Sequence, residues 1–130
     1  GNDSLIFMEI DLPLGDQIRT WDEFDPNLYL LNLSLNVKAD KESYFDTKQV
    51  KFGMREVGVK GTRFTMNGRE IFIRGTVNSA EFPLTGYPVM DEPGWLHILK
   101  TCKDYGLNCV RFHSWCPPEA AFKVADSLGI

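Results

Sequence analysis

Five residues with chemically useful side chains lie in the second half of the chain: Glu81, Arg111, His113, Ser114 and Trp115. A fixed guanidinium lowers the pKa of a neighbouring carboxylate and holds its orientation. A tryptophan offers a flat apolar face with one hydrogen-bond donor, and a loop glutamate accepts hydrogen bonds from hydroxyl groups. Four of these residues also have a structural alternative: a salt bridge for the arginine, packing for the histidine and the tryptophan, and a solvated charge for the glutamate.

The remaining acidic residues favour structural roles. Glu119 falls in the first turn of an expected helix, where a negative charge stabilises the helix N-terminus. Asp22, Glu23 and Asp25 share one loop in the first half of the chain and lack the ligand spacing of a calcium loop. The sequence therefore predicts no metal site.

The cysteines favour packing over metal binding or crosslinking. Cys102, Cys109 and Cys116 recur every seven residues, which matches neither paired zinc ligands nor the even count of a disulfide framework. We expect three buried free thiols.

Composition and charge exclude several classes of partner. With 130 residues, 43% hydrophobic and 25% charged, the chain has the composition of an ordinary globular protein with one modest core. The net charge is −4 and the basic residues are scattered, unlike those of a nucleic-acid binder. No apolar run approaches the roughly 20 residues of a membrane span. We expect neither nucleic acid nor membrane as a partner.

The first half of the chain reads as β-strands. Three runs predict them: residues 5–10, 28–37 and 49–56. Apolar residues mostly alternate with polar ones in the second run, so one face should be buried and the other solvated. Residues 21–27 predict a loop held against the sheet by Trp21 and Phe24, and a turn is expected around residues 41–47. Because so few strands leave open edges, further strands are expected upstream.

The second half begins with a β-hairpin. Asn67-Gly68 separates the alternating runs 63–66 and 70–74, and both residues of such a turn readily take positive φ.

Helices and a strand follow the hairpin. Asp91 predicts the N-cap of a helix with an apolar face that includes Trp95 and Leu99 and an end near Gly106. A short apolar strand, 108–112, comes next, and a second helix starts at Cys116-Pro117-Pro118 and stops at Gly129. The order strand, helix, strand, helix predicts parallel crossover units. Two such units are too few to close a barrel, which needs about 250 residues.

Several stretches resemble glycoside hydrolase family 2, whose members include β-galactosidases, β-glucuronidases and β-mannosidases. Residues 21–29, WDEFDPNLY, resemble the run W-x-x-x-x-P-x-L-Y of its immunoglobulin-like domain, and residues 52–57, FGMREV, resemble the strand that closes that domain. Residues 64–75, FTMNGREIFIRG, resemble the hairpin before the first barrel strand. Residues 106–111, GLNCVR, match N-x-N-x-V-R except for the first glycine, and residues 125–129, ADSLG, match C-D-x-x-G except for the first alanine. Their common order and spacing carry the resemblance over nearly the whole chain.

The resemblance implies a mixed fold. Residues 1–60 would be the C-terminal strands of a partial antiparallel immunoglobulin-like β-sandwich. Residues 61–130 would be a β-hairpin and the first two β/α units of a TIM barrel. The parent protein would be a retaining glycosidase acting on β-linked glycosides, periplasmic or extracellular, without a cofactor. Its two catalytic glutamates are expected beyond residue 130, so the fragment by itself should be inactive.

The resemblance also implies roles for the five candidate residues. Arg111 ends the second barrel strand, where the matching arginine of this clan lies beside the nucleophile. Glu81, His113, Ser114 and Trp115 are candidate substrate-binding residues, since loops at the carboxyl ends of barrel strands build the pocket. The chain departs from the family here: residues 74–82 lack the histidines of the RGVNRHEH run, and Ser114 replaces the histidine of S-H-Y-P. The usual sugar contacts therefore do not transfer.

Two other functions remain open from the sequence. The first is a non-catalytic module that binds carbohydrate or packs domains together, and the second is a degenerate barrel kept as a scaffold. The expected partners are a carbohydrate and the rest of the parent polypeptide. The strand around Val110 and the helix faces would otherwise expose apolar surface, so a homo-oligomer is a further alternative.

Overall fold

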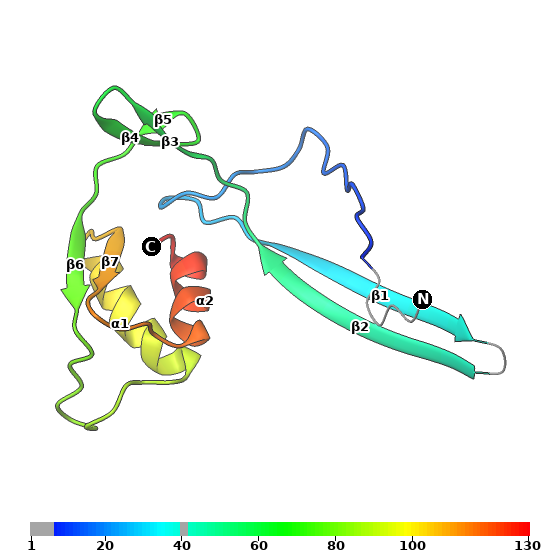
Figure 1. Ribbon diagram of the computed structural model, residues 1–130. Coiled ribbons are helices and arrows are strands. Elements are labelled where there is room, and N and C mark those ends of the chain that lie inside the picture. Colours follow the sequence, from blue (N-terminus) through cyan, green and yellow to red (C-terminus); the bar gives the residue numbers. More distant parts are fainter. Residues whose placement is uncertain (1–6, 40–41) are drawn as a thin grey trace.

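The computed structural model describes residues 7–39 and 42–130. Its elements, in chain order, are β1 (Tyr29–Ala39), β2 (Glu42–Phe52), β3 (Val57–Lys60), β4 (Arg63–Met66), β5 (Arg69–Glu70), β6 (Gly75–Asn78), α1 (Glu92–Asp104), β7 (Cys109–Phe112) and α2 (Glu119–Leu128). The strands form three small sheets, and the two helices lie beside the last of them (Figure 1). The described chain is a mixed, strand-rich structure with few helices.

Strands β1 and β2 form one long antiparallel hairpin, with Tyr29 opposite Phe52 and Ala39 opposite Glu42 (Figure 1). The strand predicted over residues 28–37 is confirmed. The turn predicted around residues 41–47 is wrong, because residues 42–47 belong to β2, and Lys41 lies outside the described residues. Aromatic and β-branched residues in this stretch favour the strand.

One face of this hairpin is mostly apolar, although Lys48 and Asp46 also lie on it, opposite Leu33 and Leu35. Alternation along the two strands puts these side chains on it: Leu31, Leu33, Leu35 and Val37 from β1, with Tyr44, Val50 and Phe52 from β2. Burial of this face was expected and is wrong for the described residues, since Leu33 and Leu35 are 44% and 47% exposed. A two-stranded sheet has no second layer to cover it.

The segment before the hairpin is irregular. A strand was predicted over residues 5–10, but residues 7–10 are not in a strand, and Leu5 and Ile6 lie outside the described residues. Apolar side chains such as Phe7 and Ile10 are exposed here, and no partner strand lies alongside within the described chain. Strand conformation needs such a partner for its backbone groups.

Strands β3, β4 and β5 form a small antiparallel sheet. Asn67 and Gly68, with φ of 52° and 77°, make the turn between β4 and β5, which confirms the predicted turn. The strand predicted over residues 70–74 is wrong in its extent, because β5 ends at Glu70. Strand β3 pairs with β4, so this sheet spans residue 60, where the two halves of the chain were expected to meet.

The remaining elements form a parallel crossover unit followed by a second helix. Strands β6 and β7 pair in parallel, and α1 connects them, as predicted. Asp91 caps α1 by accepting a hydrogen bond from the Gly94 N–H at 3.0 Å. Helix α2 begins after Pro118 and ends at Gly129, whose φ of 75° is the left-handed conformation that favours glycine at a helix end.

The core lies between the two helices and one face of the β6–β7 pair. Trp95 and Leu99 of α1 and Ala121 and Val124 of α2 are its buried residues. Val110 and Phe112 of β7 pack against them. The opposite face of the pair, with Val77 and Arg111, is exposed. The helices thus cover one side of the parallel pair and leave the other open.

Candidate functional site

The loops that follow β6 and β7 meet at one edge of the parallel pair. The carbonyl of Asn78, the last residue of β6, accepts hydrogen bonds from the His113 backbone N–H at 2.9 Å and the Trp115 indole N–H at 3.1 Å. The Asn78 side-chain oxygen accepts a third bond, from the Ala80 N–H at 3.1 Å. Sequence reasoning missed Asn78. Its position directly after a short strand is the signal, since asparagine side chains commonly order the start of a turn.

Trp115 is half-buried in an aromatic cluster with three other rings. Its ring stacks on Trp95 with centroids 6.2 Å apart and meets Phe82 and Phe112 edge-on, at 6.0 and 5.7 Å. The cluster anchors the loop after β6, because Phe82 belongs to that loop. At least part of the Trp115 surface is therefore engaged in packing.

Arg111 lies on the open face of the parallel pair. It is opposite Val77 in the register, on the side of the sheet away from the helices, and it is exposed. Its guanidinium forms no ion pair with any acidic group in the part of the chain that the structure describes. It is therefore available to a partner on this face.

Glu81 is an exposed residue at the carboxyl edge of β6. It borders two surface depressions of the loop after β6, one with Gly86 and Tyr87 and the other with Leu84 and Val89. Neither depression includes Arg111 or the residues after β7. The described chain brings the five candidate residues to one edge of the sheet but does not enclose them in a common pocket.

His113 and Ser114 are both exposed and follow β7 directly. Ser114 has a φ of 62°, and Ala80, which follows β6 by two residues, has a φ of 60°. A left-handed conformation costs a non-glycine residue about 1–3 kcal/mol and is concentrated at functional sites. Two such residues on neighbouring loops mark this edge as the candidate site.

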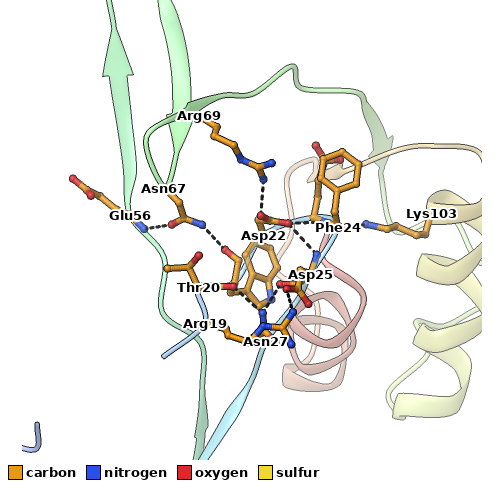
Figure 2. A network of polar contacts seen from close by, with 12 residues as sticks. Arg19, Thr20, Asp22, Phe24, Asp25, Asn27, Glu56, Asn67, Arg69 and Lys103 are labelled. Carbon is orange, nitrogen blue, oxygen red and sulfur yellow. Dashed lines mark hydrogen bonds and ion pairs between the residues drawn. The ribbon is translucent and has the colours of Figure 1, made fainter. Parts of the chain in front are cut away.

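A second polar network lies far from this edge, around residues 19–27, which we call the Trp21 loop (Figure 2). One Asp22 carboxylate oxygen accepts hydrogen bonds from the backbone N–H groups of Phe24 and Asp25, at 2.8 and 2.9 Å, and the other binds Arg69 at 2.6 Å. Asn67 donates to the Trp21 carbonyl at 3.0 Å. The loop is thus tied to the β4–β5 hairpin.

Trp21 ties the same loop to α2. Its indole N–H donates to the Asp126 carbonyl at 2.6 Å, and the Arg55 guanidinium lies 5.0 Å from the ring centroid. Trp21 is 4% exposed, as predicted for a residue that holds the loop. The matching prediction for Phe24 is wrong, because Phe24 is 74% exposed. The bonds to Asp22 turn the chain at this point, and the phenyl ring extends into solvent.

Neither a metal cluster nor a membrane helix is present in residues 7–39 and 42–130. These residues contain no group of three or more His, Cys, Asp or Glu side chains placed to hold a metal ion. Neither α1 nor α2 has the length and apolar character needed to cross a membrane.

The cysteines are free, as predicted, but they are less buried than expected. Cys102 and Cys109 are half-buried, and Cys116 is exposed because it lies in the loop before α2 and not on a packed face. Burial raises the pKa of the Cys102 thiol, and a backbone hydrogen bond partly offsets this shift.

We therefore expect Cys116 to be alkylated faster than Cys102 by iodoacetamide at pH 8. A raised pKa reduces the fraction of Cys102 present as thiolate, the reactive form, and burial restricts access to its sulfur. Mass spectrometry of the peptides over time measures both rates. In urea the two rates should converge, and equal rates in the folded chain would contradict the structure.

Comparison with known proteins bears on both the sequence and the fold. A β-galactosidase of Leuconostoc mesenteroides is 31% identical over 124 residues, which is 95% of this chain. The crystal structure of a Parabacteroides merdae β-glucuronidase is 27% identical and matches 86% of the chain with a TM-score of 0.71. A glycosyl hydrolase family 2 member from Bacteroides cellulosilyticus, at 21% identity, shares the fold over 86% of the chain with a TM-score of 0.74. The chain is of the glycoside hydrolase family 2 type.

The family 2 relatives are much longer than this chain. The chain spans 11% of the L. mesenteroides β-galactosidase, 14% of the P. merdae β-glucuronidase and 15% of the B. cellulosilyticus protein. No family model matches it. What the relatives share with it is therefore one continuous part of a larger family 2 polypeptide.

Proposed function

We propose that this chain is part of a retaining glycoside hydrolase that acts on β-linked glycosides. The observation that carries this proposal is the match of 95% of the chain to a β-galactosidase, together with the same fold in a β-glucuronidase. A parallel pair with strained, polar loops at its carboxyl edge fits a part of such an enzyme's active-site wall. The partners are a carbohydrate substrate and the rest of the parent polypeptide.

The finer architecture proposed is an immunoglobulin-like sandwich followed by a barrel. Residues 1–60 are assigned to the last strands of the sandwich and residues 61–130 to the hairpin and first two β/α units of a TIM barrel. Two uncovered faces support this assignment: the apolar face of the β1–β2 hairpin and the face of the β6–β7 pair opposite the helices. A second sheet would cover the former, and further barrel strands would enclose the latter.

Each candidate residue has a proposed role at this edge. Arg111 orients the catalytic nucleophile and lowers the pKa of its carboxyl group, and its exposed position without an acidic partner in the described chain supports this role. Glu81, His113 and Ser114 contact sugar hydroxyl groups, which their exposure supports. Trp115 contributes the part of its ring that the aromatic cluster leaves uncovered.

We expect the 130-residue chain to show no hydrolysis of nitrophenyl β-glycosides. The two catalytic carboxylates of a retaining glycosidase lie about 5 Å apart, and both are assigned to strands beyond this chain. The measurement compares the chain with a version extended through a complete barrel, on a panel of β-galactoside, β-glucoside, β-glucuronide and β-mannoside substrates.

Hydrolysis by the extended chain and hydrolysis by the 130-residue chain have different consequences for the proposal. Activity of the extended chain alone supports the proposal and identifies the sugar, and loss of that activity in Arg111→Ala supports the role of the arginine. Hydrolysis by the 130-residue chain itself would overturn the assignment of the catalytic carboxylates to later strands.

A second candidate function applies to residues 1–60. The Trp21 loop bonds to both α2 and the β4–β5 hairpin, which favours a role in packing domains together. If the extended chain is inactive on every substrate but still folds cooperatively, this packing role on a non-catalytic scaffold becomes the better account.

A further inference from the structure

The Trp21 loop contacts the amino-terminal edge of the β6–β7 pair, and the candidate site lies at the opposite, carboxyl-terminal edge. Arg74 and Asn108 directly precede β6 and β7, so they mark the amino ends of these strands, whereas the candidate residues follow the carboxyl ends. Figure 1 shows the Trp21 loop near the chain's C-terminus, at the start of β6, and the loop after β6 at the far end. Strand β6 is four residues long, so the two edges are about 13 Å apart.

Glu23 is the residue of the Trp21 loop that reaches the start of β6. Its carboxylate pairs with the Arg74 guanidinium, and the two side chains are only 14% and 38% exposed. Because Glu23 is largely buried, solvent screens this pair less than an ordinary surface pair, although the Arg74 side chain keeps partial contact with solvent.

Arg74 is in turn bonded along its whole length to the start of β7. Its Nε–H donates to the Gly106 carbonyl at 2.7 Å, and its backbone N–H donates to the Asn108 side chain at 2.8 Å. The Asn108 backbone N–H donates back to the Arg74 carbonyl at 2.9 Å. The Glu23 carboxylate therefore completes a network that sets how β6 starts beside β7.

The backbone of the Trp21 loop at Glu23 is held by Lys103 of α1 and by Gly129 at the end of α2. The Lys103 ammonium donates to the Glu23 carbonyl and, at 3.0 Å, to the Gly129 carbonyl. Gly129 approaches so closely that an added Cβ would lie 2.8 Å from the Glu23 carbonyl oxygen. Glu23 is thus held by its backbone against the ends of both helices, and its side chain is directed at β6.

The geometry points to Glu23 as a positioning residue that acts through Arg74 on strand β6 and, along that strand, on the loops of the candidate site. At the far end of the strand, the Asn78 carbonyl accepts a hydrogen bond from the His113 N–H, and the Asn78 side-chain oxygen accepts one from the Ala80 N–H. A shift or loosening of β6 is therefore transmitted to both loops of the candidate site. This inference goes beyond the proposed glycosidase function and rests on it for what the site does.

The test is residue-resolved hydrogen exchange of the 130-residue chain with Glu23→Gln. The substitution keeps the size of the side chain and removes the charge that Arg74 pairs with. The His113 and Ala80 amides should exchange about tenfold faster, the effect of losing one charge-assisted hydrogen bond. Amides in the centre of α1 should change far less.

Asp25→Asn is the matched control. Asp25 lies in the same loop and also pairs with an arginine, Arg19, but both side chains are at least half exposed and neither contacts β6. Exchange at His113 and Ala80 should stay within about twofold of the original chain, as for a surface pair.

A uniform acceleration at all amides in Glu23→Gln would mean a purely structural role and would overturn the inference, as would no change at His113 and Ala80. If Glu23→Gln fails to fold, Arg74→Lys gives the same readout, since it keeps the charge but removes the guanidinium that reaches both Glu23 and Gly106. The measurement needs no hydrolase activity. A negative result here and a failure of the proposed function are therefore distinguishable.

Discussion

Replacing Trp95 by alanine should destabilise the chain by about 3–5 kcal/mol. Trp95 is fully buried, and its ring contacts Phe82, Phe112 and Trp115. Its indole N–H also donates to the Val89 carbonyl at 2.8 Å, so the substitution leaves a cavity and an unpaired acceptor. Against a typical total stability of about 5–15 kcal/mol, this loss is a third or more of the stability of a domain near the middle of that range, and it should lower the urea midpoint accordingly. Urea unfolding followed by far-UV circular dichroism measures it.

Tyr105→Ala is the control for this prediction. Tyr105 is also aromatic and lies at the end of the same helix, but it is 83% exposed. Its removal should change the free energy of unfolding by about 0.5 kcal/mol or less. Similar losses in the two variants would mean that the aromatic cluster is not the core of this chain.

Replacing Gly129 by alanine should also be strongly destabilising, for two separate reasons. The left-handed φ of 75° costs an alanine about 1–3 kcal/mol. In addition, the new Cβ would lie 2.8 Å from the Glu23 carbonyl oxygen and 2.9 Å from its Cα, closer than packed atoms approach. Either the Trp21 loop or the end of α2 must move. The free energy of unfolding from urea titration measures the combined effect.

Gly106→Ala separates these two causes. Gly106 lies two residues after the end of α1, and Gly129 lies directly after α2. Gly106 has nearly the same φ, 78°, but an added Cβ there has no atom within 4 Å. Gly106→Ala should incur only the conformational cost, so Gly129→Ala should be worse by a further 1–3 kcal/mol, roughly the cost of overpacking. Equal losses would show that the Trp21 loop does not press against the end of α2.

Local patterns in the sequence were sufficient for the elements with strong local signals. Asn67-Gly68 makes the predicted turn, Asp91 caps the predicted helix, and Gly129 ends the other. Each of these residues acts through its own φ or through bonds within a few positions, which neighbouring sequence alone determines. The parallel pairing of β6 and β7 could also be predicted from the sequence, because a strand, a helix and a second strand of these lengths favour a right-handed crossover.

The tertiary structure decided what depends on contacts between distant segments. The polar residues of 42–47 suggested a turn, yet they pair with β1 across the hairpin. The apolar face of that hairpin is exposed because burial requires a second layer, which alternation by itself cannot supply.

In the candidate site, too, the sequence predicted the positions of the residues, and long-range contacts determined how they are held. Its residues follow strand ends, and the sequence located them there through the predicted β7 and the family motifs. Their anchoring by Asn78 and the aromatic cluster depends on side chains up to 37 positions apart. The docking of Glu23 on Arg74 and Lys103, across 51 and 80 positions, likewise has no local signal. Propensity, capping and turn chemistry act over a few residues, so the sequence by itself determined the elements and the edge that carries the candidate residues. Only the tertiary structure decided that the Trp21 loop docks at the opposite edge of the parallel pair, through Arg74 and Lys103.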